Sequence, residues 1–155
     1  MKTLFTAALA AATLAAAPAL AHKPGGLEAV QAWSRPAAAG MTGAGYMTIR
    51  NHGQAEQTLV KVETPAAARV EVHQTVVSGG VARMQAVPRL TIPAGGEVRL
   101  APGGHHLMLI KLARPLKAGQ RLPATLTFAS GVKVRTEIVV GTAAPPEQAG
   151  SIHNH

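Results

Sequence analysis

The chain has 155 residues, of which 47% are hydrophobic and 3% aromatic, and it contains no cysteine. Its formal net charge is +8, but the basic residues are scattered and the aromatic residues are too few for a stacking platform, which argues against nucleic-acid binding. The lack of cysteine excludes disulfides and thiolate metal sites, and the seven acidic residues, all Glu, are too dispersed for a carboxylate calcium site.

Residues 1–21 have the layout of a secretory signal peptide. A basic start, Met1-Lys2, precedes an apolar run at 4–14 and a small-x-small ending at 18–21. The apolar run is too short and too rich in alanine for a membrane span, and no cysteine stands at the cleavage site to carry a lipid. We therefore expect cleavage after Ala21 and an exported chain without a membrane span.

The rest of the chain predicts one all-β domain at 22–140 and a flexible tail at 141–155. Short runs rich in Val, Ile, Leu and Thr alternate with breaks containing Pro and Gly, and no window shows a sustained helical period. This spacing indicates a β-sandwich or small barrel of about eight or nine strands. The predicted strands are 27–33, 45–51, 57–63, 69–77, 81–87, 97–100, 105–112, 122–128 and 133–140.

Residues 69–87 predict a hairpin that carries a His and a Met. The Ser-Gly-Gly turn at 78–80 supplies residues that tolerate positive φ. If the Ser-Gly pair forms the loop, His73 lies directly opposite Met84; if the Gly-Gly pair forms it, His73 faces Ala86 and Met84 is its diagonal neighbour on the same face. A three-residue loop would put Met84 on the other face. Either two-residue loop brings an imidazole and a thioether together.

The predicted strand 105–112 carries a second such pair. Because side chains alternate along a strand, His106 and Met108 share one face and His105 leaves the other. Two imidazoles and two thioethers form a neutral, soft donor set, which favours Cu(I). A thioether needs no deprotonation and forms no disulfide, so this set is suited to a carrier in an oxidising compartment. His105 is expected to be structural or to support a ligand.

These four residues follow a known spacing. Ten residues separate His73 from Met84, twenty-one separate Met84 from His106, and Met108 completes a His-x-Met pair. In this pattern the chain resembles the PCuAC periplasmic copper chaperones, and the likeness extends over about residues 29–140, including 44–51 and 102–108. The chain departs from many relatives in two places. Gln74 stands where they have a Met directly after the first ligand His. The acidic residue that they carry before the Leu-Val strand is displaced here or is replaced by Glu56.

The resemblance implies a cupredoxin-like β-sandwich or barrel in the periplasm. It implies a Cu(I) site made by His73, Met84, His106 and Met108, and delivery of copper to the CuA centre of cytochrome c oxidase. The implied partners are the apo CuA domain of subunit II, a Sco-type thiol protein, or both. We expect a monomer without enzymatic activity.

The remaining methionine and histidine residues of the predicted domain have other expected roles. Met47 is expected to pack in the core, whereas Met41, in a Gly-flanked loop, either fills a gap or approaches the site. His52 is expected to be a solvated turn residue.

The two ends of the mature chain predict a second, weaker site. Cleavage after Ala21 leaves His22 with a free amine beside its imidazole, and the tail adds His153 and His155. Nitrogen donors of this kind suit Cu(II).

Three function classes stay open on the residues alone. The first is a copper carrier, the second is a copper or zinc sequestration protein that buffers metal, and the third is an exported binding domain whose His and Met are incidental. A redox enzyme is disfavoured because the sequence has no thiolate for a blue-copper site and no nucleotide fingerprint.

Overall fold

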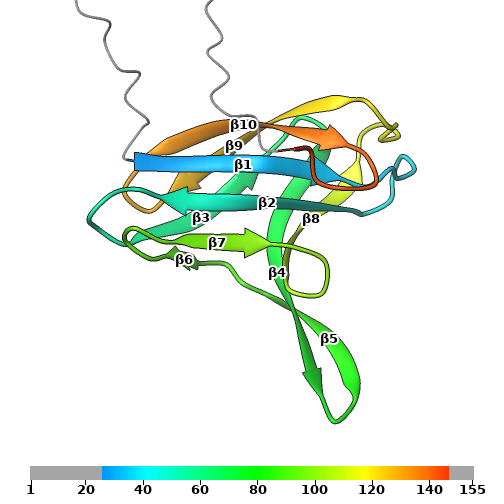
Figure 1. Ribbon diagram of the computed structural model, residues 1–155. Helices are drawn as coiled ribbons and strands as arrows, with labels where there is room; N and C mark the ends of the chain where they lie inside the picture. The colour runs from blue at the N-terminus through cyan, green and yellow to red at the C-terminus, as the bar shows by residue number, and fades with distance from the viewer. Residues whose placement is uncertain (1–25, 147–155) are drawn as a thin grey trace, which may run out of the picture.

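The computed structural model describes residues 26–146, and within that range it has ten β-strands and no α-helix (Figure 1). The same range contains no helix that could cross a membrane. The strands are β1 Leu27–Ser34, β2 Gly43–Asn51, β3 Gln57–Glu63, β4 Ala67–Ser78, β5 Val81–Ala86, β6 Leu90–Ile92, β7 Glu97–Leu100, β8 His105–Leu112, β9 Arg121–Phe128 and β10 Lys133–Val140.

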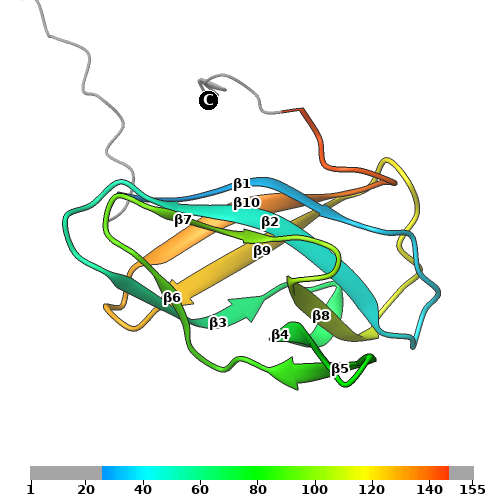
Figure 2. The ribbon, with the colours of Figure 1, turned by 60° about the horizontal axis from the view of Figure 1, so that its bottom comes forward.

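Seven of these strands close into a barrel, which confirms the predicted all-β, cupredoxin-like class. The order is β4-β8-β2-β1-β10-β9-β3, and β3 returns to β4 through the pair Val62–Val70. β5 extends the sheet beside β4, β6 pairs with β3, and β7 pairs with β2 (Figure 2). All pairings between these strands are antiparallel except that of β1 with β10.

The nine predicted strands are all present, and the sequence analysis missed only β6. This strand has three residues and stands between Pro88 and Pro93. Three residues are too few for an alternating pattern, and prolines on both sides read as turn signals. Burial of Leu90 and Ile92 against the core, rather than a local pattern, holds this segment extended.

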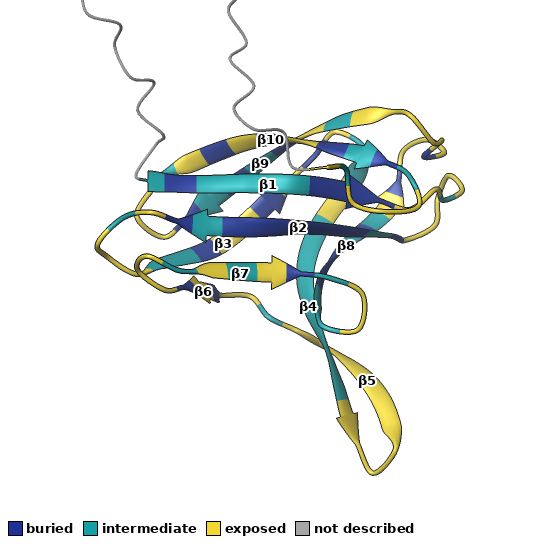
Figure 3. Cartoon of the chain, in the orientation of Figure 1, coloured by how far each residue is buried: buried dark blue, intermediate teal, exposed yellow. Residues whose placement is uncertain are grey.

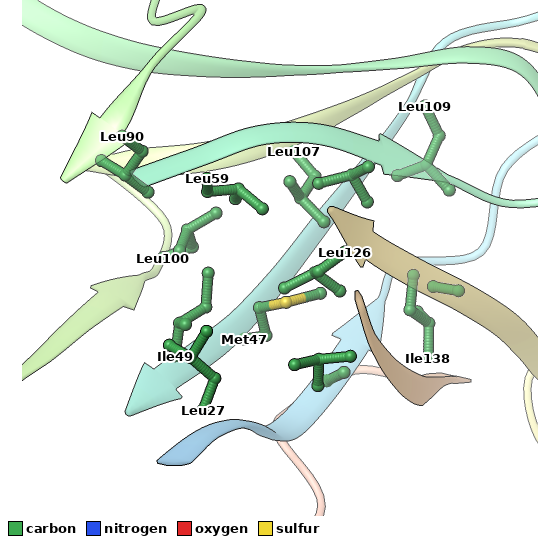
Figure 4. Packing of buried hydrophobic residues seen from close by; sticks show 14 of the residues in the cluster. Leu27, Met47, Ile49, Leu59, Leu90, Leu100, Leu107, Leu109, Leu126 and Ile138 are labelled. Atoms are coloured by element: carbon green, nitrogen blue, oxygen red, sulfur yellow. The ribbon is translucent and has the colours of Figure 1, made fainter. Parts of the chain in front are cut away.

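The barrel interior is filled mainly with aliphatic side chains, and nearly every strand of the barrel contributes some of them (Figure 4). Met47 is 2% exposed and belongs to this core, as predicted. On β8, Leu107 and Leu109 are fully buried in the same cluster. Because side chains alternate along a strand, His106 and Met108 must leave the opposite, outer face of the barrel wall.

One hairpin projects from the barrel. β4 is twelve residues long; its first part lies in the barrel wall, and its second part runs outward beside β5 (Figure 1). All six residues of β5 are exposed (Figure 3). The loop is Gly79-Gly80, with φ of 58° and 76°, values that only glycine adopts easily and that suit a two-residue hairpin turn.

Candidate metal centre

Two histidines meet where the projecting hairpin leaves the barrel. Antiparallel pairing of β4 with β8 puts His73 directly opposite His106. Their ring centroids lie 6.1 Å apart, with an angle of 43° between the ring planes. His106 is only 4% exposed although it points away from the aliphatic core, and the side chain of His73 is 18% exposed. The sheet register thus brings together two imidazoles that are 33 positions apart in the sequence.

Met108 lies on the same face, one pair further along the two strands. It is opposite Glu71 and diagonal to His73, and it is half-buried. Directly opposite and diagonal neighbours on one face of a sheet are within reach of long side chains. The thioether of Met108 therefore lies beside the histidine pair.

Met84 joins this face from the hairpin. The structure has the second of the two registers considered for the sequence: His73 pairs with Ala86, and Met84 pairs with Thr75. Met84 is thus the diagonal neighbour of His73, with 61% of its surface exposed. The four predicted ligands share one face, three of them on the barrel wall and one on the exposed hairpin.

Each histidine has one ring nitrogen committed to a hydrogen bond. The Nε2–H of His73 donates to Oε2 of Glu71 at 2.9 Å, and the Nδ1–H of His106 donates to the carbonyl oxygen of Gly104 at 3.1 Å. A carboxylate and a carbonyl can only accept, so these bonds specify the tautomer of each neutral ring. The lone pairs are left on Nδ1 of His73 and Nε2 of His106.

Those two nitrogens are also the only buried side-chain nitrogen or oxygen atoms between residues 26 and 146 that lack a hydrogen-bond partner. A buried polar atom without a partner is costly, by about 1–3 kcal/mol. The two nitrogens belong to neighbouring rings, and each keeps a free lone pair of the kind that can bind a metal ion. Their ring separation also suits one ion shared by two imidazoles.

The donor types narrow the choice of ion. No group of three or more His, Cys, Asp or Glu able to hold a metal occurs between residues 26 and 146. The two thioethers of Met84 and Met108 lie on the same face as the histidines, and this donor type selects soft ions such as Cu(I).

Among residues 26–146, Glu71 is the acidic residue that is hydrogen-bonded to one of these histidines. Its Oε2 accepts from His73, and its Oε1 accepts from Nε of Arg69 at 2.8 Å. The hydrogen bond from His73, and after it the bond from Arg69, lowers the pKa of the Glu71 carboxyl. Sequence analysis did not single out Glu71, although its place two residues before His73 on an alternating strand was a usable signal.

The Gly104 carbonyl is a second feature that the sequence analysis did not identify. It accepts from His106 Nδ1 and also from the backbone N–H of Thr75 at 3.1 Å. One backbone oxygen thus fixes both the ring of His106 and the start of the hairpin. No side-chain pattern could have revealed it, because the acceptor is main chain.

Within residues 26–146, the other histidines and methionines lie away from this face. His105 is paired with Gln74 and therefore lies on the other face of β8. The Met41 carbonyl accepts from the backbone N–H of Leu112, at the far end of β8. His52 contacts Glu28 at 3.0 Å and is half-exposed. The predicted Cu(II) ligands at the termini, His22, His153 and His155, lie outside the described residues.

The model of the LpqE-like family, whose description names lipoproteins, matches residues 27–140. Lxx21020 of Leifsonia xyli subsp. xyli, which is named as a lipoprotein, is 40% identical over 119 residues that span 74% of this chain and 71% of that protein. The family model covers every strand of the barrel.

Solved structures with the same fold include a domain of PmoF1 and a protein from Deinococcus radiodurans. The apo PCuAC domain of PmoF1 superposes with a TM-score of 0.64 at 24% identity, over 80% of this chain and 98% of that one. The solution structure of CuI-DR1885 from Deinococcus radiodurans has a TM-score of 0.57 at 34% identity, over 77% of this chain and 80% of that one.

Proposed function

Because this chain belongs to the LpqE-like family, we propose that it is an exported copper chaperone of the PCuAC type that carries Cu(I) and passes it to an acceptor. The lipoprotein names of the family and of its Leifsonia relative support export. The solved structure of CuI-DR1885, at 34% identity, supports Cu(I) as the cargo.

The observation that carries this proposal is the pair of buried nitrogens without partners, Nδ1 of His73 and Nε2 of His106. We assign these atoms as the two nitrogen donors, and the sulfurs of Met84 and Met108 as the other two. All four donors are neutral, so the site carries a single positive charge when Cu(I) is bound. Sulfur donors make this site better for Cu(I) than for the harder Cu(II).

Unequal exposure of the ligands suits transfer. His106 is almost fully buried, whereas Met84 is 61% exposed and lies on β5, whose only neighbouring strand is β4. An acceptor can therefore reach the copper from the hairpin side and displace the thioether of Met84 first. The acceptor proposed here is the CuA domain of cytochrome c oxidase subunit II, served directly or through a Sco-type thiol protein.

Titration of the reduced protein with Cu(I) against a competing chelator tests the site. One equivalent should bind tightly, and affinity should fall in His106→Ala and in Met84→Ile. The chain offers matched controls: His105→Ala alters a neighbouring histidine on the other face, and Met41→Ile alters a methionine that is 60% exposed. Unchanged affinity in both site variants would refute the assignment.

Mixing the Cu(I)-loaded protein with an apo CuA domain, and assaying copper in each after separation, tests delivery. Copper should move to the CuA domain, and a requirement for a Sco-type thiol protein would identify a relay. Copper that stays on the chaperone under both conditions would instead support a protein that buffers the metal.

A further inference from the structure

Glu71 is hydrogen-bonded to His73, one of the two histidines, without being one of the four proposed ligands. Arg69, Glu71 and His73 alternate on β4 and therefore share its outer face. Across the strand pair they lie opposite Ile110, Met108 and His106. The Glu71 carboxylate thus lies between the Arg69 guanidinium and the His73 imidazole, and Glu71 is paired with Met108 across the two strands.

The two oxygens of this carboxylate have separate partners. Oε1 accepts from Arg69 Nε at 2.8 Å, and Oε2 accepts from His73 Nε2 at 2.9 Å. Arg69 fixes the carboxylate from one side, so the oxygen that meets His73 has a defined direction. A carboxylate that accepts from the far nitrogen of a metal-binding imidazole fixes the tautomer and raises the basicity of the ring.

From this geometry we propose that Glu71 is the positioning residue of the copper site, which holds His73 in the Nε2–H tautomer so that Nδ1 is the nitrogen offered to Cu(I). This inference rests on the proposed function, since it concerns the same site.

The two histidines differ in what holds them. His106 donates to the main-chain carbonyl of Gly104, an acceptor that no side-chain substitution removes. His73 depends on a side chain that is 37% exposed. The orientation of His73 is therefore the part of the site that a single substitution can release, and Glu71 is where that substitution must be made.

Long-range ¹H–¹⁵N spectra of the apo protein, in mildly alkaline buffer where imidazole is neutral, report the tautomer of each ring. Wild type should show His73 protonated at Nε2 and His106 at Nδ1. Glu71→Ala should convert His73 to a mixture of tautomers and leave His106 unchanged. Glu71→Gln should restore only part of the His73 signal, because its single amide oxygen can accept from Nε2–H but can no longer accept from Arg69 at the same time. A side chain with a merely structural role would not move this signature.

Cu(I) affinity should follow the tautomer. Glu71→Ala should weaken binding by about 10–100-fold, the usual effect of removing an outer partner of a metal ligand, and Glu71→Gln should bind more tightly than Glu71→Ala. The matched control is Glu137→Gln, another exposed strand carboxylate, which pairs with Arg121 at 3.0 Å and should change neither readout.

Two results would overturn the proposal. One is a Glu71→Ala protein that keeps the wild-type His73 tautomer and Cu(I) affinity. The other is a Glu71→Gln protein as impaired as Glu71→Ala in both readouts. Because the spectra are recorded without copper, they remain informative if wild type binds no Cu(I), a result that would reject the proposed function instead.

Discussion

The proposed site depends on one ring nitrogen in each of two histidines. In His73 and in His106, one nitrogen donates to an oxygen and the other is buried without a partner. Such a pattern costs stability in the apo protein, and it leaves the rings ready to bind an ion without a change of tautomer. In the proposed site, the barrel orients the two rings and Cu(I) would be the partner that the two nitrogens lack.

The two methionines should differ in what their loss does. Met108→Ile and Met84→Ile should both weaken Cu(I) binding by at least about 10–100-fold, more than an outer partner does. Met84→Ile should also leave thermal stability unchanged, since Met84 is 61% exposed. Competition with a Cu(I) chelator and thermal unfolding of the apo proteins measure the two effects. Full affinity in Met84→Ile would exclude that residue from the site.

The Glu71 carboxyl should make stability depend on pH. Its pKa is lowered in the folded protein by His73 and then by Arg69. A lowered folded pKa stabilises the fold above the carboxyl's ordinary pKa, and this contribution is lost as the pH falls through the folded value. In urea unfolding, the stability difference between wild type and Glu71→Gln should therefore be largest near neutral pH and shrink in acid. A difference that stayed constant from neutral to acid pH would contradict this coupling.

The residue-level predictions differ in how far the sequence alone supports them. Alternation along one strand assigned His106 and Met108 to one face, and the hairpin pairing together with the spacing singled out His73 and Met84. The choice of ring nitrogen was out of reach, because it depends on a main-chain carbonyl at Gly104 and on the rotamer of Glu71. Hydrogen-bond partners that meet only in the folded chain leave no pattern in the sequence.

Among the elements, the β4–β5 hairpin determines whether Met84 can reach the proposed copper site. Its Gly79-Gly80 loop sets the register that puts Met84 across from Thr75. The sequence allowed two registers for a two-residue loop, and both kept Met84 on the histidine face. The structure has the one in which Met84 lies further out along the hairpin, where it is more exposed.

Moving the thioether by one position along β5 should abolish its contribution. In Arg83→Met/Met84→Arg the methionine leaves the opposite face of the hairpin, so Cu(I) affinity should fall to that of Met84→Ile. In Met84→Ala/Ala86→Met the methionine returns to the histidine face, directly opposite His73, and part of the affinity should return. Competition with a Cu(I) chelator measures the Cu(I) affinity of wild type, Met84→Ile and the two double variants. Equal affinities for the two double variants would show that the face of β5 is irrelevant.

At the level of the whole molecule, the site and the core are on opposite sides of one barrel wall. Leu107 and Leu109 point inward and His106 and Met108 outward from the same strand. The fold class was predictable because short alternating runs and Gly or Pro breaks recur along the chain. Closure of the barrel through β3 and β4 was not, since one pair, Val62 with Val70, makes that contact.

This division predicts that stability and copper binding can be changed separately. Leu126→Ala empties a fully buried position on β9 and should lower the free energy of unfolding by about 2–5 kcal/mol. Cu(I) affinity should stay at the wild-type value where the variant is folded. Urea unfolding and chelator competition provide the two numbers, and Val77→Ala, at a position that is 68% exposed, is the control with little effect on stability.

One strand, β4, belongs both to the closed barrel and to the exposed hairpin, so its amide hydrogens should exchange with solvent in two regimes. Amides in its first part should open only with the barrel, whereas those beside β5 should open locally at much lower free energy. Copper bound across His73 and Met84 would tie the second part to the first, and a ligand that binds only the closed form adds to its stability by mass action. Loading with Cu(I) should therefore slow exchange selectively in the outer half of β4 and in β5. The bound ion would then act as a cross-link that holds the hairpin to the barrel.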